Sequence, residues 1–284
     1  HRKRHMLTDL NNAINYNEIY DQLMQLTLCV YTPSNYIFPS KLQKYKDLTH
    51  NKGENLTQTG RERGIQRLMS INLLKRLESS VNSFQLTLTR IKELINGTIE
   101  AINRFEKYGS ADIAMYEASR DDWDIDDENT EFFTVGKKVK IELADMDWKS
   151  WRNELQQDAD VLELLTLMVA DITPEHDTKL QELLRLLDEK ITHPINPNNK
   201  KVLIFSAFSD TAEYLYDHVS MYMKDKYGLN TAVITGTIDG RTTIKGLPAT
   251  LNNVLTCFSP VSKDRDVLMP NSRNEIDILI ATDC

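Results

Sequence analysis

Three short apolar runs near the end of the chain constrain its fold more than any other feature. They span residues 202–205, 231–236 and 277–283. A stretch with helical spacing, from Ala212 to Met223, separates the first two. Because strands alternate with a helix here, the sequence predicts an α/β fold with a parallel sheet. Consecutive apolar residues are typical of such sheets, so we expect the first run to be buried on both faces.

Small and polar residues follow these runs at their carboxyl ends. Ser206 ends the first strand, Thr235 and Gly236 follow the second, and Thr282 and Asp283 end the third. Parallel strands bring their carboxyl ends to one edge of a sheet, where the chemistry of such folds is located. Hydroxyl groups and a glycine backbone can approach a phosphate there. The same residues can instead serve as turns and helix caps.

The order of these segments resembles the second RecA-like lobe of superfamily II helicases, in the SWI/SNF and HepA-like translocase branch. Residues 202–211 (VLIFSAFSDT) resemble motif IV, residues 234–236 (ITG) resemble the TG element, and residues 278–283 (ILIATD) resemble the start of motif V. The resemblance covers residues 196–284, and more weakly residues 73–80, which look like an inter-lobe helix of bacterial members. The connection over residues 239–273 departs from the family, which has a simple helix there.

The resemblance implies part of an ATP-dependent nucleic-acid helicase or translocase. Contacts to the nucleic-acid backbone, DNA rather than RNA, would come from Ser206, Thr235, Gly236 and Thr282. Asp283 would orient a loop or an arginine, because its charge repels phosphate. ATP and Mg²⁺ would bind in the parent enzyme, between this lobe and the first lobe of the same parent chain.

We expect no catalytic or metal-binding residue in this chain itself. The sequence contains neither the Gly-x-x-x-x-Gly-Lys-Ser/Thr loop that cradles phosphates nor an Asp-Glu-x-His box. The rest of motif V and the later arginine motif of the family are also missing. The six histidines show no spacing that suggests a metal site.

The sequence predicts three regions. Residues 1–45 would be the exit from the first lobe, residues 46–195 a helical insertion, and residues 196–284 the truncated N-terminal half of the second lobe. The last boundary falls in a run rich in Pro and Asn, residues 194–199.

A long apolar stripe dominates the helical insertion and predicts one continuous helix over residues 61–107. Shorter patterns predict a helix over residues 14–30 and an amphipathic run from Leu155 to Met168, which Trp148 and Trp151 precede. Another helix would start with Thr173 as N-cap and Pro174 at its first position. Lys75 and Arg76 interrupt the stripe; we favour a solvated helix face, with a contact to a duplex backbone as the alternative. The stripe consists of Leu74, Leu77, Val81, Phe84, Leu88, Ile91, Ile95, Ile102 and Phe105.

The charge of the chain is distributed unevenly. The net charge is −8, but residues 1–100 hold 14 Lys/Arg against 9 Asp/Glu. Eight acids lie between Glu117 and Glu131, and we expect the surrounding segment, residues 110–135, to be a solvated acidic loop. A local basic face, rather than the net charge, decides whether phosphate is bound.

The three cysteines are widely spaced, which argues against a zinc site and a disulfide framework. This usage favours a reduced, cytoplasmic compartment. No run is apolar for long enough to span a bilayer, so we expect no membrane partner.

Two other classes of function stay open. The apolar stripe over residues 74–105 is compatible with a helical protein-interaction module that carries an α/β appendage and has no nucleic-acid role. A small-molecule α/β enzyme would need a glycine-rich turn after the first strand, where residues 206–209 read Ser-Ala-Phe-Ser.

Overall fold

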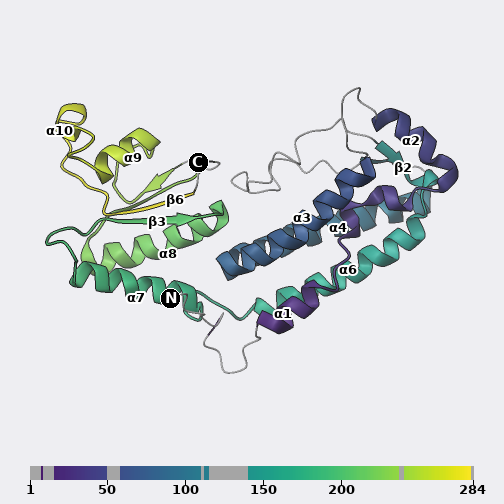
Figure 1. Ribbon diagram of the computed structural model, residues 1–284, viewed down its shortest axis with the longest axis horizontal. Coiled ribbons are helices and arrows are strands. Elements are labelled where there is room, and N and C mark those ends of the chain that lie inside the picture. The colour runs from purple at the N-terminus through teal and green to yellow at the C-terminus, as the bar shows by residue number, and fades with distance from the viewer. Residues whose placement is uncertain are drawn as a thin grey trace.

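The computed structural model describes residue 8 and residues 16–49, 58–109, 112–114, 140–236 and 240–282. The acidic stretch from Glu117 to Glu131 and the candidate Asp283 lie outside these residues. Figure 1 shows a helical part on one side and an α/β part on the other. The α/β class predicted from the sequence is confirmed by the parallel strands of the second part.

The helical part is built around two long helices, α4 and α6, which pack against each other. They run antiparallel, because the Gln85 side chain near the start of α4 donates to the carbonyl of Val169 at the end of α6 (2.8 Å). The Arg152 side chain near the start of α6 reaches Asn103 on the later part of α4. The helices of this part are α1 (Tyr16–Leu23), α2 (Leu42–Thr49), α3 (Gln58–Ser79), α4 (Val81–Tyr108) and α6 (Trp148–Val169).

Short elements complete this part. Strands β1 (Asp112–Ala114) and β2 (Lys140–Glu142) form an antiparallel pair. The segment after α1 is held by two buried carboxylates: Asp158 accepts hydrogen bonds from the backbone of Thr27 and Cys29, and Glu62 accepts from Ser34. The predicted helix over residues 14–30 is therefore too long. The chain instead forms the 3₁₀ turns η1 (Cys29–Tyr31), η2 (Pro33–Tyr36), η3 (Pro39–Lys41) and, before α6, η5 (Leu143–Asp145).

The long helix predicted over residues 61–107 is broken at Ser80, so its continuity was wrong. Ser80 has extended backbone angles (φ −157°, ψ 149°), and its side chain accepts a hydrogen bond from the Ser83 amide as the N-cap of α4. A serine oxygen satisfies one of the amides that lack a partner at a helix start, which stabilises the break. The buried stripe was right along its middle, where Phe84, Leu88 and Ile95 are fully buried, while Leu74 and Phe105 at its ends are only partly buried.

The α/β part contains a four-stranded sheet in the order β3-β6-β4-β5. The first three strands are parallel and β5 is antiparallel. The strands are β3 (Val202–Ser206), β4 (Thr231–Ile234), β5 (Arg241–Thr242) and β6 (Ile278–Thr282), and the helices are α7 (Thr178–Thr192), α8 (Ser209–Tyr227), α9 (Leu251–Phe258) and α10 (Arg265–Leu268).

Helices cover the two faces of this sheet unequally. Residues of α7 and α8 form one core with the strands, and α9 forms a second core on the opposite face, against β4 and β6. The edge strand β3 is open on the α9 side, where Leu203 is 47% and Phe205 62% exposed. The expected burial of β3 on both faces was therefore wrong, because α9 does not extend over the edge of the sheet.

Helix α7 begins later than its sequence pattern suggested. Its N-cap is Asp177, whose carboxylate accepts hydrogen bonds from the amides of Lys179 and Leu180. An aspartate caps a helix start well and adds a favourable charge at its positive end. Thr173, the predicted cap, instead donates a hydrogen bond to Glu175 within a turn (2.7 Å). Among the described helices, none is both long and apolar enough to cross a membrane.

Candidate nucleic-acid interface

The register of the parallel strands brings the predicted site residues to one edge of the sheet. Ser206 of β3 is paired with Thr282 of β6, and Ile234 of β4 is paired with Ala281. Thr235 and Gly236 directly follow β4, so they lie at the same carboxyl edge. We name this group of residues (Ser206, Thr235, Gly236 and Thr282) the strand-tip edge.

The side chains of the strand-tip edge differ in what they offer to a ligand. The Ser206 hydroxyl accepts a hydrogen bond from the Phe208 amide (3.2 Å) and donates one to the Phe208 carbonyl (3.1 Å). Thr235 is half-buried and Gly236 is exposed. Thr282 is only 2% exposed, so its hydroxyl lies beneath the surface. Gly236 is therefore the most exposed residue of the strand-tip edge, Ser206 and Thr235 are half-buried, and Thr282 is covered.

The turn after β3 is tied to the helical part through Asp210. This residue lies in the first turn of α8. Its carboxylate accepts hydrogen bonds from the guanidinium groups of Arg76 (2.7 Å) and Arg90 (2.8 and 3.1 Å). Charged hydrogen bonds of this kind are among the strongest polar contacts in proteins.

Arg76 is buried, which corrects both interpretations made from the sequence. The side chain is 2% exposed, so it is neither a solvated face nor available to a duplex backbone. Its guanidinium lies over the Phe208 ring (4.6 Å) and also donates to the Ser83 hydroxyl (3.0 Å). Lys75 is exposed, as expected for a solvated helix face. A charged residue within an apolar stripe was the one sequence sign that a buried ion pair existed.

The bend between α3 and α4 supplies the rest of this contact. The hydroxyls of Ser79 and Ser80 lie 2.8 and 3.2 Å from the Thr211 hydroxyl on α8. The Lys179 ammonium on α7 donates to the Ser79 carbonyl (2.9 Å), and burial lowers its pKa. The break at Ser80 therefore brings the two parts of the chain together.

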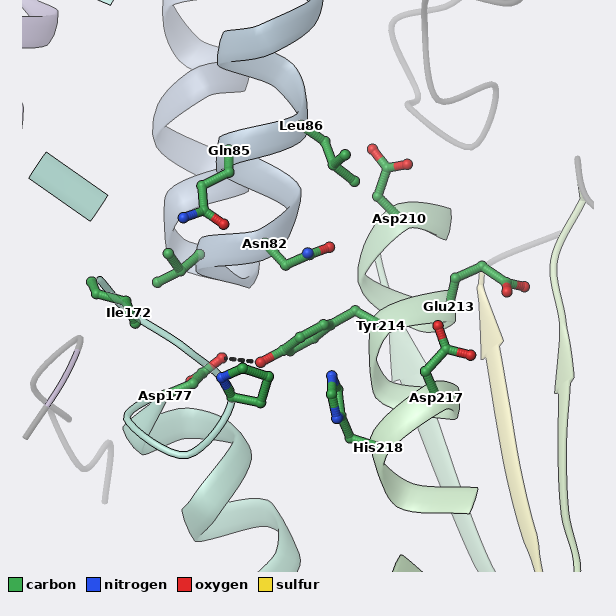
Figure 2. A pocket seen from close by; sticks show the side chains of 12 residues that line it. Asn82, Gln85, Leu86, Ile172, Asp177, Asp210, Glu213, Tyr214, Asp217 and His218 are labelled. Carbon is green, nitrogen blue, oxygen red and sulfur yellow. Dashed lines mark hydrogen bonds between the residues drawn. The ribbon is translucent and has the colours of Figure 1, made fainter. Parts of the chain in front are cut away.

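A pocket of about 360 Å³ lies beside this contact, between the start of α4, residues 172–177 and α8. Figure 2 shows Tyr214 reaching from α8 across the pocket to Asp177, with a hydrogen bond of 3.0 Å. Burial raises the pKa of Tyr214. The lining includes the carboxylates of Asp177, Asp210, Glu213 and Asp217. Asp210, Glu213 and Asp217 are paired with arginines, but among the described residues no lysine or arginine lines the pocket itself, so it offers a phosphate little positive charge.

No protein-family model, curated protein or solved structure matches the chain. Within the described part of the chain, no group of His, Cys, Asp and Glu side chains is arranged to hold a metal ion. The helicase resemblance therefore stays a prediction, and the structural support for it comes from the strand-tip edge.

Proposed function

We propose that this chain is part of an ATP-dependent nucleic-acid helicase or translocase. It would contribute contacts to the nucleic-acid backbone and one wall of the ATP cleft. The observation that carries this proposal is the shared edge: the three segments that resemble motif IV, the TG element and motif V end side by side on parallel strands.

The chemistry of the strand-tip edge suits phosphate oxygens. Main-chain amides and hydroxyls donate hydrogen bonds to phosphates without reading bases, so sequence preference should be weak. DNA is the favoured polymer, and the first helicase lobe of the parent chain is the proposed partner. ATP and Mg²⁺ belong to the cleft of the parent enzyme, and a cytoplasmic location is part of the same proposal.

A protein-interaction module is the second candidate function. Leu164 and Leu167 are exposed one turn apart on α6, and they give the helical part an apolar surface. This candidate predicts self-association or partner binding through that surface, and no response to nucleic acid. Sedimentation of the chain alone and with DNA distinguishes the two.

A titration of the chain into labelled duplex DNA, followed by fluorescence anisotropy, tests the proposal. Each neutral hydrogen bond contributes only about 0.5–1.5 kcal/mol, so we combine Ser206→Ala with Thr235→Val. The double variant should bind more weakly than the wild type. Thr98→Val is the matched control, because its hydroxyl donates to the Leu94 carbonyl within α4, away from the sheet. An equal loss of DNA affinity in the Thr98→Val control and in the double variant would contradict the site assignment.

A further inference from the structure

The contact between the two parts of the chain centres on Arg76, and it leads directly to the strand-tip edge. We propose that Arg76 is a positioning residue: from the helical part, it fixes the turn that carries Ser206 for contact with a nucleic-acid backbone. This inference rests on the proposed function and adds a residue from outside the α/β part to the site.

The contacts of Arg76 bracket the turn after β3. Its guanidinium donates to Asp210 (2.7 Å) and lies over the ring of Phe208 (4.6 Å). The Phe208 amide in turn donates to the Ser206 hydroxyl (3.2 Å). One guanidinium therefore holds the residues on both sides of Ser209, and Phe208 passes that restraint to Ser206.

Burial excludes a direct role for this arginine. Arg76 and Phe208 are both buried, and Ser83, which accepts a second hydrogen bond from Arg76, is fully buried. A buried charge is stable only when it is paired and hydrogen-bonded, and Asp210 meets that need. Nucleic acid at the surface cannot reach the guanidinium without opening the contact between the two parts.

Arginine suits this position better than lysine. Its planar group lies over the Phe208 ring while one terminal nitrogen, Nη1, donates to both the Asp210 carboxylate and the Ser83 hydroxyl. A lysine ammonium is a compact point charge without a planar face to stack on the ring. Arg90, the second partner of Asp210, differs because its side chain is 36% exposed. Arg90 donates hydrogen bonds to the same Asp210 carboxylate from its more exposed side.

The dependence of DNA affinity on salt distinguishes positioning from contact. Each arginine that touches a phosphate of duplex DNA contributes about 0.9 to the slope of log affinity against log salt. We expect Arg76→Gln to lower the affinity about two- to tenfold, at most the contribution of the Ser206 hydrogen bond that it positions, and to leave the slope unchanged. A lower slope in the variant would mean that Arg76 contacts phosphate, and would overturn the proposal.

A second variant keeps the test decisive if Arg76→Gln fails to fold, as judged by circular dichroism. Phe208→Leu removes the ring beneath the guanidinium and changes no charge. It should also weaken DNA binding at an unchanged salt slope, and an affinity equal to that of the wild type would overturn the proposal.

If the wild-type chain does not bind labelled duplex DNA at low salt, the proposed function fails and this inference fails with it. If the wild type binds and the folded variants bind equally well, only this inference fails.

Discussion

Asp145 is a buried carboxylate of the helical part whose ionised form is stabilised by its neighbours. Its side chain is 5% exposed, and its carboxylate accepts hydrogen bonds from Lys44 and Tyr45, both at 2.7 Å. The Lys44 ammonium and the Tyr45 hydroxyl lower the pKa of Asp145 from 3.8 to about 2. The charged carboxylate therefore joins η5 to α2, and its ion pair with Lys41 (3.1 Å) joins η5 to η3.

This pKa predicts how stability depends on acid. The folded-state pKa lies below the unfolded value, so the stabilisation is complete above pH 3.8 and is lost as the pH falls toward about 2. We expect Asp145→Asn to be less stable than the wild type at pH 7, and the difference to shrink between about pH 4 and pH 2. Urea unfolding at a series of pH values measures this. Asp266→Asn, at an exposed site, is the control, and a difference that stays constant down to pH 2 would contradict the assignment.

Substituting alanine for two glycines, Gly97 and Gly240, should change the stability of the chain in opposite directions. Gly97 lies on the exposed side of α4 with nothing near its Cβ position, so Gly97→Ala should raise the free energy of unfolding by about 1 kcal/mol. A Cβ on Gly240 would lie 2.2 Å from the Ala249 carbonyl oxygen and 2.6 Å from the Ile234 side chain. Gly240→Ala should therefore destabilise the chain. Thermal melts of both variants check this, and a lower melting temperature for Gly97→Ala would mean that α4 is not helical there.

Single residues also show the limits of sequence reasoning. The position of Arg76 within an apolar stripe could be read from spacing alone. Its partner Asp210 could not, because 134 positions separate them and spacing says nothing about which distant segments meet. For the same reason, the sequence favoured a solvated helix face for Arg76, although the structure shows that Arg76 forms a buried ion pair.

At the scale of elements, apolar spacing predicted burial better than it predicted continuity. The steps of three and four continue through the bend, since Leu77, Val81 and Phe84 keep helical spacing across Ser80. Apolar spacing alone cannot reveal a one-residue break in a helix when the apolar side chains stay on the same face before and after it. The capping serine was the only local sign of that break.

The stripe of α4 allows a direct test of the helical core. Leu88 is fully buried, so Leu88→Asp places a charge among apolar side chains and should cost roughly 3–5 kcal/mol of stability. Leu167→Asp on the exposed side of α6 is the matched control and should change stability little. A circular-dichroism melt that shifts equally for the two variants would show that the stripe is not core.

The burial of β3 shows why element-level predictions fail at sheet edges. Its run of apolar residues is compatible with any position in a parallel sheet. The order β3-β6-β4-β5 makes β3 an edge strand, and that order is set by long-range pairing rather than by the strand itself. By contrast, the shared carboxyl edge could be predicted, because it needs only that the strands be parallel.

At the scale of the whole molecule, the chain should not hydrolyse ATP on its own. The sequence holds no phosphate-cradling loop, and the described carboxylates form no metal site. Phosphate release measured with and without DNA should stay at the background of a reaction without protein. Turnover that remains after extensive purification would contradict the assignment of this chain to one side of a two-lobe enzyme.

The central claim is that nucleic acid lies along the strand-tip edge. Amide hydrogen exchange, measured with and without duplex DNA, tests it most directly because it maps protection along the whole chain. We predict that DNA slows exchange at residues 206–209 and 234–236, while the buried middle of α6 is unchanged. Protection confined to the helical part, or no protection at saturating DNA, would contradict the claim.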